Sequence, residues 1–210
     1  MINRCEVNKS GEVRENYIIK SFTAGLLPLI DNYGYLMTQV VEENDYFAVR
    51  KSPLQIMQDS LLYYGHDLEG ASQASRQALG NINMPPVKVY DRIYWFPIYS
   101  KEREHNIWLS ANHVDRYKAE NKKETSLDIG KKYTITLELS LRAYERKLNK
   151  ARTLEKIHHD RFQEIDEDTP IETNTHIIKE YQHPYYYFAE VGQKPNNEKK
   201  GKQKIFFLQN

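Results

Sequence analysis

KSPLQIMQDSLLYYG, at residues 51–65, carries the start and stop signals of a helix that packs onto the rest of the protein. Ser52 is a favourable N-cap, and Gln55 stands three residues later, at capping-box spacing. Pro53 suits the first turn of a helix, where the N–H group that proline lacks would have no partner within the helix. Gly65 is placed to end the helix. Apolar residues recur at three- and four-residue steps, at Leu54, Met57, Leu61 and Tyr64. We therefore predict a docked helix over 52–64.

The residues before this helix predict strands. Residues 16–20 and 24–30 are short apolar segments bounded by polar residues. Residues 35–42 and 46–50 are separated by the turn sequence Glu43-Asn44-Asp45, which is typical of a hairpin. An antiparallel sheet is therefore expected ahead of the helix.

The residues after it predict further helix and strand. Residues 65–70 have loop composition, and residues 71–79 are rich enough in Ala, Gln and Arg to form a short helix. Residues 93–99 are almost wholly apolar or aromatic, as in a strand covered on both faces. Residues 113–139 alternate between apolar and polar and predict two or three strands. The fold class is α+β with antiparallel sheets.

A long basic helix is predicted near 140–162, with Ser140 as its cap. Its apolar residues fall on one side, at Leu141, Tyr144, Leu148, Ala151, Leu154 or Glu155, and His158. Between residues 142 and 161 the basic residues outnumber the acidic ones by seven to three, a local excess of four. The basic residues are Arg142, Arg146, Lys147, Lys150, Arg152, Lys156 and Arg161, and the acidic ones are Glu145, Glu155 and Asp160. Two interpretations stay open, a solvated helix in which Glu145 pairs with basic neighbours, or a phosphate-binding surface.

The C-terminal part follows an acidic linker. Residues 175–181 and 185–191 predict a last strand pair, so a single domain is expected over 1–191. The aromatic run within the second strand is read mainly as core, with base stacking or the docking of a proteolytic adaptor as alternatives. Residues 192–210 are expected to be a basic flexible tail.

Composition limits the function. The net charge of +1 over 210 residues excludes a generally basic DNA-coating protein, so any nucleic-acid surface must be local. The single cysteine, Cys5, excludes an internal disulfide and a cysteine-based zinc site. We find no signal peptide or long apolar run, and we expect a cytoplasmic protein without a membrane segment.

The motifs of common enzymes are missing from the sequence. We find no Gly-rich phosphate loop, serine nucleophile elbow or His-Glu-x-x-His helix. His158 and His159 are adjacent and point apart on a helix, while His105 and His113 flank Trp108 without a third ligand at suitable spacing. We predict no catalytic residues, no metal and no cofactor.

A set of residues in the middle third resembles the ComK family of competence transcription factors. The set comprises Ser52–Ile56, Ser60, Tyr63–Gly65, Glu69–Gly70, Pro85–Pro86, Ile93–Pro97, Trp108, Ser110 and His113–Val114. The resemblance implies a Gram-positive transcription activator that switches on DNA-uptake genes by binding A-rich and T-rich boxes of double-stranded DNA, largely through the minor groove. It also implies a homo-oligomer and control by a protease adaptor.

The chain departs from the family pattern in its charged residues. Ala71-Ser72-Gln73 stand where the family usually has a basic pair, and Ile98 and Lys101–Glu104 stand where it usually has a Thr and a Ser- and Arg-containing run. Asn106-Ile107 stand where a Cys commonly precedes the Trp. The departures at Ser72, Gln73 and Glu104 and the near-neutral charge favour an alternative, a degenerate paralogue that acts as a protein-interaction module. It would be either the partner of a DNA-binding relative or a proteolysis decoy for it. A nuclease is a third class, for which we find no metal ligands.

The candidate DNA-binding residues come from two parts of the chain. The basic helix is expected to position the protein on phosphates, and Arg suits the narrow minor groove of A-tracts. The predicted helix residues are Arg142, Arg146, Lys147 and Lys150. The predicted contributors from the motif region are Arg76, Lys88 and Arg92.

Overall fold

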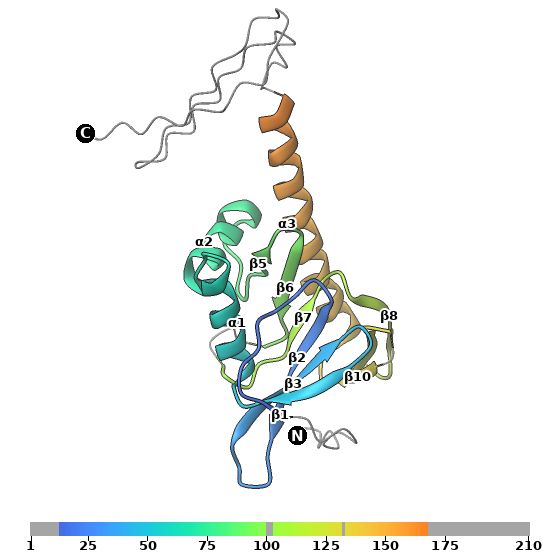
Figure 1. Ribbon diagram of the computed structural model, residues 1–210. Helices are drawn as coiled ribbons and strands as arrows, with labels where there is room; N and C mark the ends of the chain where they lie inside the picture. The colour runs from blue at the N-terminus through green and yellow to red at the C-terminus, as the bar shows by residue number, and fades with distance from the viewer. Residues whose placement is uncertain (1–12, 100–102, 132, 168–210) are drawn as a thin grey trace, which may run out of the picture. The chain divides into compact units, whose positions relative to one another are not determined.

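The computed structural model describes residues 13–99, 103–131 and 133–167, with the backbone alone described for 164–167 (Figure 1). The strands are β1 (Val13–Arg14), β2 (Thr23–Ile30), β3 (Leu36–Glu42), β4 (Tyr46–Val49), β5 (Val87–Tyr90), β6 (Ile93–Pro97), β7 (Trp108–Ser110), β8 (Val114–Ala119), β9 (Thr125–Ile129) and β10 (Tyr133–Leu137). The helices are α1 (Pro53–Tyr63), α2 (Leu68–Leu79) and α3 (Leu141–Glu167).

Within these residues the strands form a seven-stranded sheet in the order β1-β4-β3-β2-β7-β6-β5 and a three-stranded sheet in the order β10-β9-β8. Neighbouring strands pair antiparallel except β1, which pairs parallel with β4. The predicted α+β class with antiparallel sheets is confirmed. The hairpin of β3 and β4 and the strands expected over 113–139 are also confirmed.

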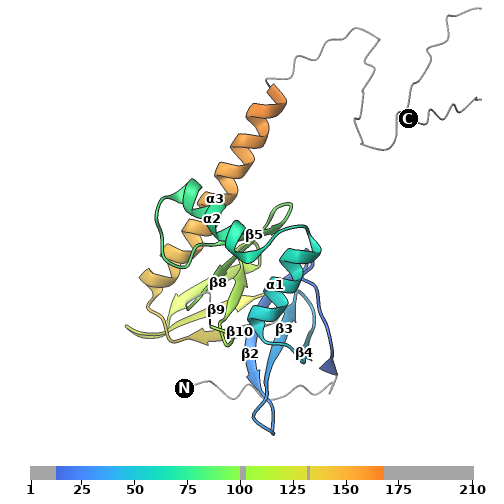
Figure 2. The same cartoon turned by 90° about the vertical axis from the view of Figure 1, so that its left-hand side faces the viewer.

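The seven-stranded sheet is covered on both faces. Side chains alternate across a strand, so in β6 Trp95 packs with α1 on one face, while Tyr94 and Phe96 pack with α3 and the small sheet on the other. Figure 2 shows α1 lying across the first face. The prediction of a strand buried on both faces is confirmed for β6, although its position is second from the β5 edge.

Helix α1 begins and ends as its sequence predicts. Ser52 Oγ accepts a hydrogen bond from the Gln55 N–H at 3.2 Å, and the Gln55 side chain accepts one from the Ser52 N–H at 2.9 Å, which completes the capping box. Gly65 follows with a φ of +83°. The buried side differs in detail from the predicted stripe, because Ile56 and Ser60 are buried while Leu54 is only half-buried.

The prediction of a strand at residues 16–20 is wrong. The Ile19 N–H donates to Ser60 Oγ of α1 at 3.0 Å, and its carbonyl accepts from the Tyr64 hydroxyl at 2.9 Å. The backbone groups that a strand would give to a neighbouring strand are therefore used by a helix. A two-residue strand, β1, forms just before this segment instead.

The region between α1 and β6 also differs from expectation. Helix α2 begins three residues before the predicted 71–79 helix, inside the segment predicted as loop, because Asp67 caps it by accepting from the Gly70 N–H at 2.8 Å. Strand β5 was not predicted; it is only four residues long and follows Pro85-Pro86 directly. The strand pair predicted over 175–191 and the tail at 192–210 lie outside the described residues.

Gly130 joins the two sheets. Its φ is +59°, and a Cβ there would lie 2.9 Å from the Glu42 carbonyl oxygen and 3.2 Å from the Glu43 Cα. The Gly130 N–H donates to the His113 carbonyl at 3.1 Å, and the next N–H, of Lys131, donates to the Glu43 carbonyl at 2.9 Å. The turn between β3 and β4 therefore holds the small sheet through backbone contacts that leave no room for a side chain.

We expect Gly130→Ala to destabilise the protein more than Gly34→Ala. Gly34 has a φ of +87° but open space around it, so an alanine there carries only the left-handed backbone strain, about 1–2 kcal/mol. At Gly130 the backbone clash adds to that strain, and we expect about 3 kcal/mol or more in total. Urea unfolding of both variants measures the difference, and equal losses would contradict the close contact.

Candidate nucleic-acid interface

Helix α3 is fixed on the sheet by the apolar side that its sequence predicts. Tyr144, Leu148, Ala151 and Leu154 are fully buried. The Tyr144 ring lies 5.2 Å from the Tyr117 ring and 6.1 Å from the Phe96 ring, centroid to centroid. Because this side faces the sheet, the basic residues on the opposite side of α3 face solvent.

The solvent-facing basic residues of α3 are open, meaning that they are at least partly exposed and form no ion pair with the described side chains. Arg142, Arg146, Arg152, Lys156 and Arg161 are exposed and Lys150 is partly exposed. In the described part of the chain, the observed ion pairs include none of these six residues and do not include Glu145. The pairing of Glu145 with basic neighbours, expected of a merely solvated helix, is therefore not observed there.

Lys147 is held differently from the other three predicted helix residues. Its Nζ lies 3.3 Å from the Pro97 carbonyl oxygen and 3.5 Å from Met84 Sδ, so the side chain turns toward the end of β6. Burial lowers the Lys147 pKa to about 8, and the nearby charges of Lys150 and Arg146 act in the same direction. The structure thus separates Lys147 from the open charges of α3.

The predicted residues of the motif region divide into two places. Arg76 lies on α2, where its guanidinium is 3.4 Å from a Glu69 carboxylate oxygen. Lys88 lies on β5 and Arg92 lies in the turn between β5 and β6. Lys88 and Arg92 are brought beside the second half of α3, whereas Arg76 pairs within its own helix.

A hollow of about 480 Å³ marks where the β5–β6 hairpin meets α3. It is lined by Lys88, Asp91, Arg92, Tyr94, Arg152, Glu155, Lys156, His159 and Phe162. Four of these residues are cationic and two are carboxylates, so the hollow has a net positive charge. Sequence reasoning counted Arg152 and Lys156 in the charge of the helix but did not name them as site residues, since their position beside Arg92 depends on the tertiary fold.

A histidine connects the hairpin to α3 at this place. The Nδ1 atom of His158 lies 3.0 Å from the Tyr94 hydroxyl oxygen. Burial lowers the His158 pKa from its ordinary 6.5, and the charges of Lys88 and Arg161 lower it further. The folded protein therefore favours the neutral imidazole of His158 more than the unfolded chain does.

Neither a metal-binding cluster nor a membrane-spanning helix is present in the described residues. We find no group of three or more His, Cys, Asp or Glu side chains there that is arranged to hold a metal ion. None of the described helices combines the length and apolar character that crossing a bilayer requires.

Comparison with known proteins gives the family. Residues 14–163 match the family described as ComK protein, which is more than half of the chain. This chain belongs to the ComK family. Among its relatives is the competence transcription factor of Bacillus subtilis (strain 168), 27% identical over 151 residues that cover 70% of this chain and 78% of the relative. None of the solved structures matches the chain.

The family match confirms the resemblance drawn from the motifs. It spans nearly all of the described residues of this ComK protein, from β1 to the last described side chains of α3. It therefore includes every predicted DNA-binding residue and the hairpin that meets α3. The roles of those residues remain predictions.

We expect this ComK protein to lose stability as the pH falls through about 6.5, partly because of His158. The unfolded chain takes up a proton at the ordinary pKa, whereas the folded protein resists protonation at this site, so acid favours unfolding. The melting temperature should fall less between about pH 7.5 and pH 5.5 in His158→Gln than in the wild type, by at least ~1 °C. An identical fall in both proteins would contradict this role.

Proposed function

We propose that this ComK protein is a competence transcription regulator that binds double-stranded DNA at A/T-rich promoter boxes, in part through the minor groove. The observation that carries the proposal is the set of open basic residues on α3, continued by Lys88 and Arg92 of the hairpin. The Bacillus subtilis relative is a competence transcription factor, which supports the same proposal.

The length of α3 suits a duplex. Arg142 and Arg161 are nineteen residues apart, which at about 1.5 Å per residue is roughly 29 Å. One turn of B-form DNA measures about 34–36 Å, so the two ends of this basic surface are separated by a little less than one turn. Phosphates neutralised by Lys and Arg release counterions and supply affinity that does not depend on sequence.

Selectivity needs a second contribution. The negative potential of a narrow A-tract minor groove attracts Arg side chains, so groove width rather than base pattern would be read. We propose that an arginine of this surface enters the groove. We further propose that the protein is a homo-oligomer whose symmetry matches repeated boxes. It would act in the cytoplasm as an activator, by binding and not by catalysis.

Electrophoretic mobility shift is the first test of sequence preference. A promoter fragment with paired A-rich and T-rich boxes should bind at least about tenfold more tightly than a G/C-scrambled fragment, which corresponds to roughly 1.4 kcal/mol. Equal shifts would contradict minor-groove selectivity. The absence of any shift, together with no retention on heparin at moderate salt, would contradict DNA binding and favour the protein-interaction module.

The binding face is tested by removing matched positive charges. The double variant Arg142→Ala/Arg146→Ala should weaken promoter binding, and its salt slope, log Kd against log salt, should be about 1.8 units less steep because two phosphate contacts are lost. Lys147→Met is the control, since it removes a positive charge from the same helix at a side chain that turns toward Pro97. An unchanged salt slope in the double variant would contradict this placement. So would a change in Lys147→Met as large as the change for each arginine removed.

A further inference from the structure

A second hollow, of about 340 Å³, lies between α2, β5 and α3. It is lined by His66, Ala71, Ala74, Ser75, Lys88, His158, Arg161 and Phe162. Sites for small molecules commonly measure about 300–1,000 Å³ and combine apolar walls with a few polar groups. The size of this hollow is therefore that of a small-ligand site.

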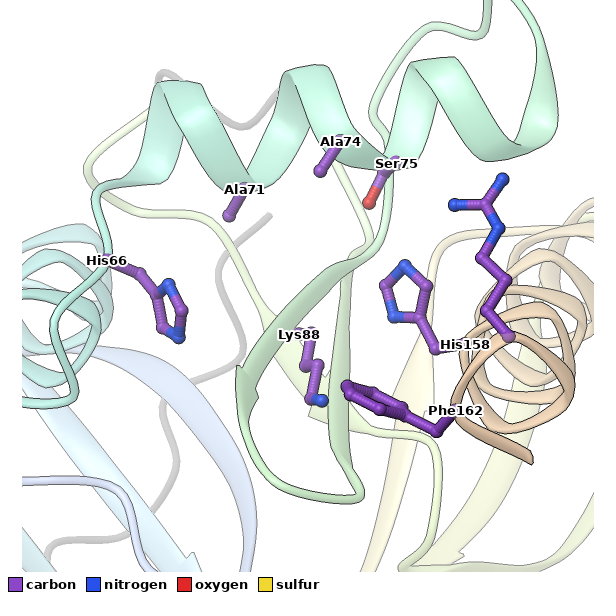
Figure 3. A pocket seen from close by; sticks show the side chains of 8 residues that line it. His66, Ala71, Ala74, Ser75, Lys88, His158 and Phe162 are labelled. Carbon is purple, nitrogen blue, oxygen red and sulfur yellow. The ribbon is translucent and has the colours of Figure 1, made fainter. Parts of the chain in front are cut away.

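Its walls are apolar and face one another. Figure 3 shows Ala71 and Ala74 on the underside of α2, directed into the space toward which the Phe162 ring extends from α3. The Phe162 side chain is 59% exposed, although it is a large apolar ring. A flat apolar group placed between the alanine methyl groups and this ring would remove both from water, which is favourable by about 25 cal/mol for each Å² of apolar surface.

The polar groups around these walls are mainly cationic. Lys88 and Arg161 carry positive charge, and no carboxylate belongs to the described lining. The Lys88 Nζ lies 4.9 Å from the centroid of the Phe162 ring, so a positive charge stands at the face of the aromatic wall. No ion pair is observed between Arg161 and the side chains that the structure describes, which end at residue 163.

Two of the remaining hydrogen-bonding groups are used by the protein. The Ser75 hydroxyl donates to the Pro86 carbonyl, and Nδ1 of His158 is bonded to the Tyr94 hydroxyl. An anion would find two cations at the edge of an apolar space.

We propose that this hollow binds a small organic anion, with a flat apolar body packed on Phe162 against α2 and an acidic group paired with Lys88 and Arg161. The acidic group is a carboxylate or a phosphate, since both match these two cations. The inference does not depend on DNA binding, although Lys88 also lines the neighbouring hollow of the candidate nucleic-acid interface.

The test uses the full-length protein and three defined probes. 1-Naphthylacetate and 1-naphthyl phosphate carry the anionic groups, and 2-(1-naphthyl)ethanol is the neutral control. Titrations followed by NMR should move the amide signals of Ala71, Ala74 and Lys88, and at least one anion should bind about tenfold or more tightly than the alcohol. The stronger anion identifies the acidic group. Equal affinity for the alcohol, or no binding by either anion, overturns the proposal.

Two matched substitutions on α2 locate the site. Ala74→Leu fills the hollow with a side chain that helices accept well, and it should lower the affinity of the bound anion at least about tenfold. Gln77→Leu adds a leucine to the same helix outside the hollow and should leave the affinity unchanged. Circular dichroism checks that both variants fold. Undiminished binding in folded Ala74→Leu, or an equal loss in Gln77→Leu, overturns the location.

Arg161→Gln tests the charge without filling the space. It should reduce the preference for the anion over the alcohol, while the affinity for the alcohol stays within about twofold. A preference that stays at the wild-type value would show that Arg161 does not pair with the acidic group, and this would overturn the proposed binding mode. A DNA-binding failure elsewhere in the protein would not change any of these readings.

Discussion

The packing of one side of α3 onto the seven-stranded sheet determines the rest of the candidate surface. Tyr144, Leu148, Ala151 and Leu154 are fully buried and fix the rotation of the helix about its own axis. A helix turned about its axis by a quarter would bury arginines, which cost far more to desolvate than leucines. The apolar side therefore decides which charges reach solvent. The regular rise of the helix, about 1.5 Å per residue, then sets the spacing of these charges along its axis.

This constraint concentrates positive charge on a chain that is nearly neutral as a whole. The net charge is +1, so long-range attraction to DNA from the whole molecule is small. Local segregation replaces it, because α3 places Arg152 and Lys156 beside Arg92 of the hairpin. The bond between His158 and Tyr94 ties the same two elements together. The contact between α3 and the β5–β6 hairpin thus both gathers the positive charges and holds them in place.

The proposed anion site arises where α2 and α3 approach β5 with small residues between them. Ala71 and Ala74 are short enough to leave space beneath α2, while Phe162 supplies a wall from the other helix. Lys88 borders both this hollow and the neighbouring basic one. An anion bound at Lys88 would share that charge with any phosphate of the duplex, so the two binding events would compete for one cation.

The sequence by itself determined the elements whose signals are local: the capping box of α1, the hairpin of β3 and β4, and the apolar side of α3, since caps and periodicity act within a few residues. Motif order was also enough to give the family. Tertiary structure alone decided that the Ile19 N–H bonds to Ser60 and not to a neighbouring strand, that Lys147 turns toward Pro97, and that Arg92 lies beside Arg152 and Lys156. Those contacts join residues from about 40 to 65 positions apart, and no short-range preference of the chain specifies them.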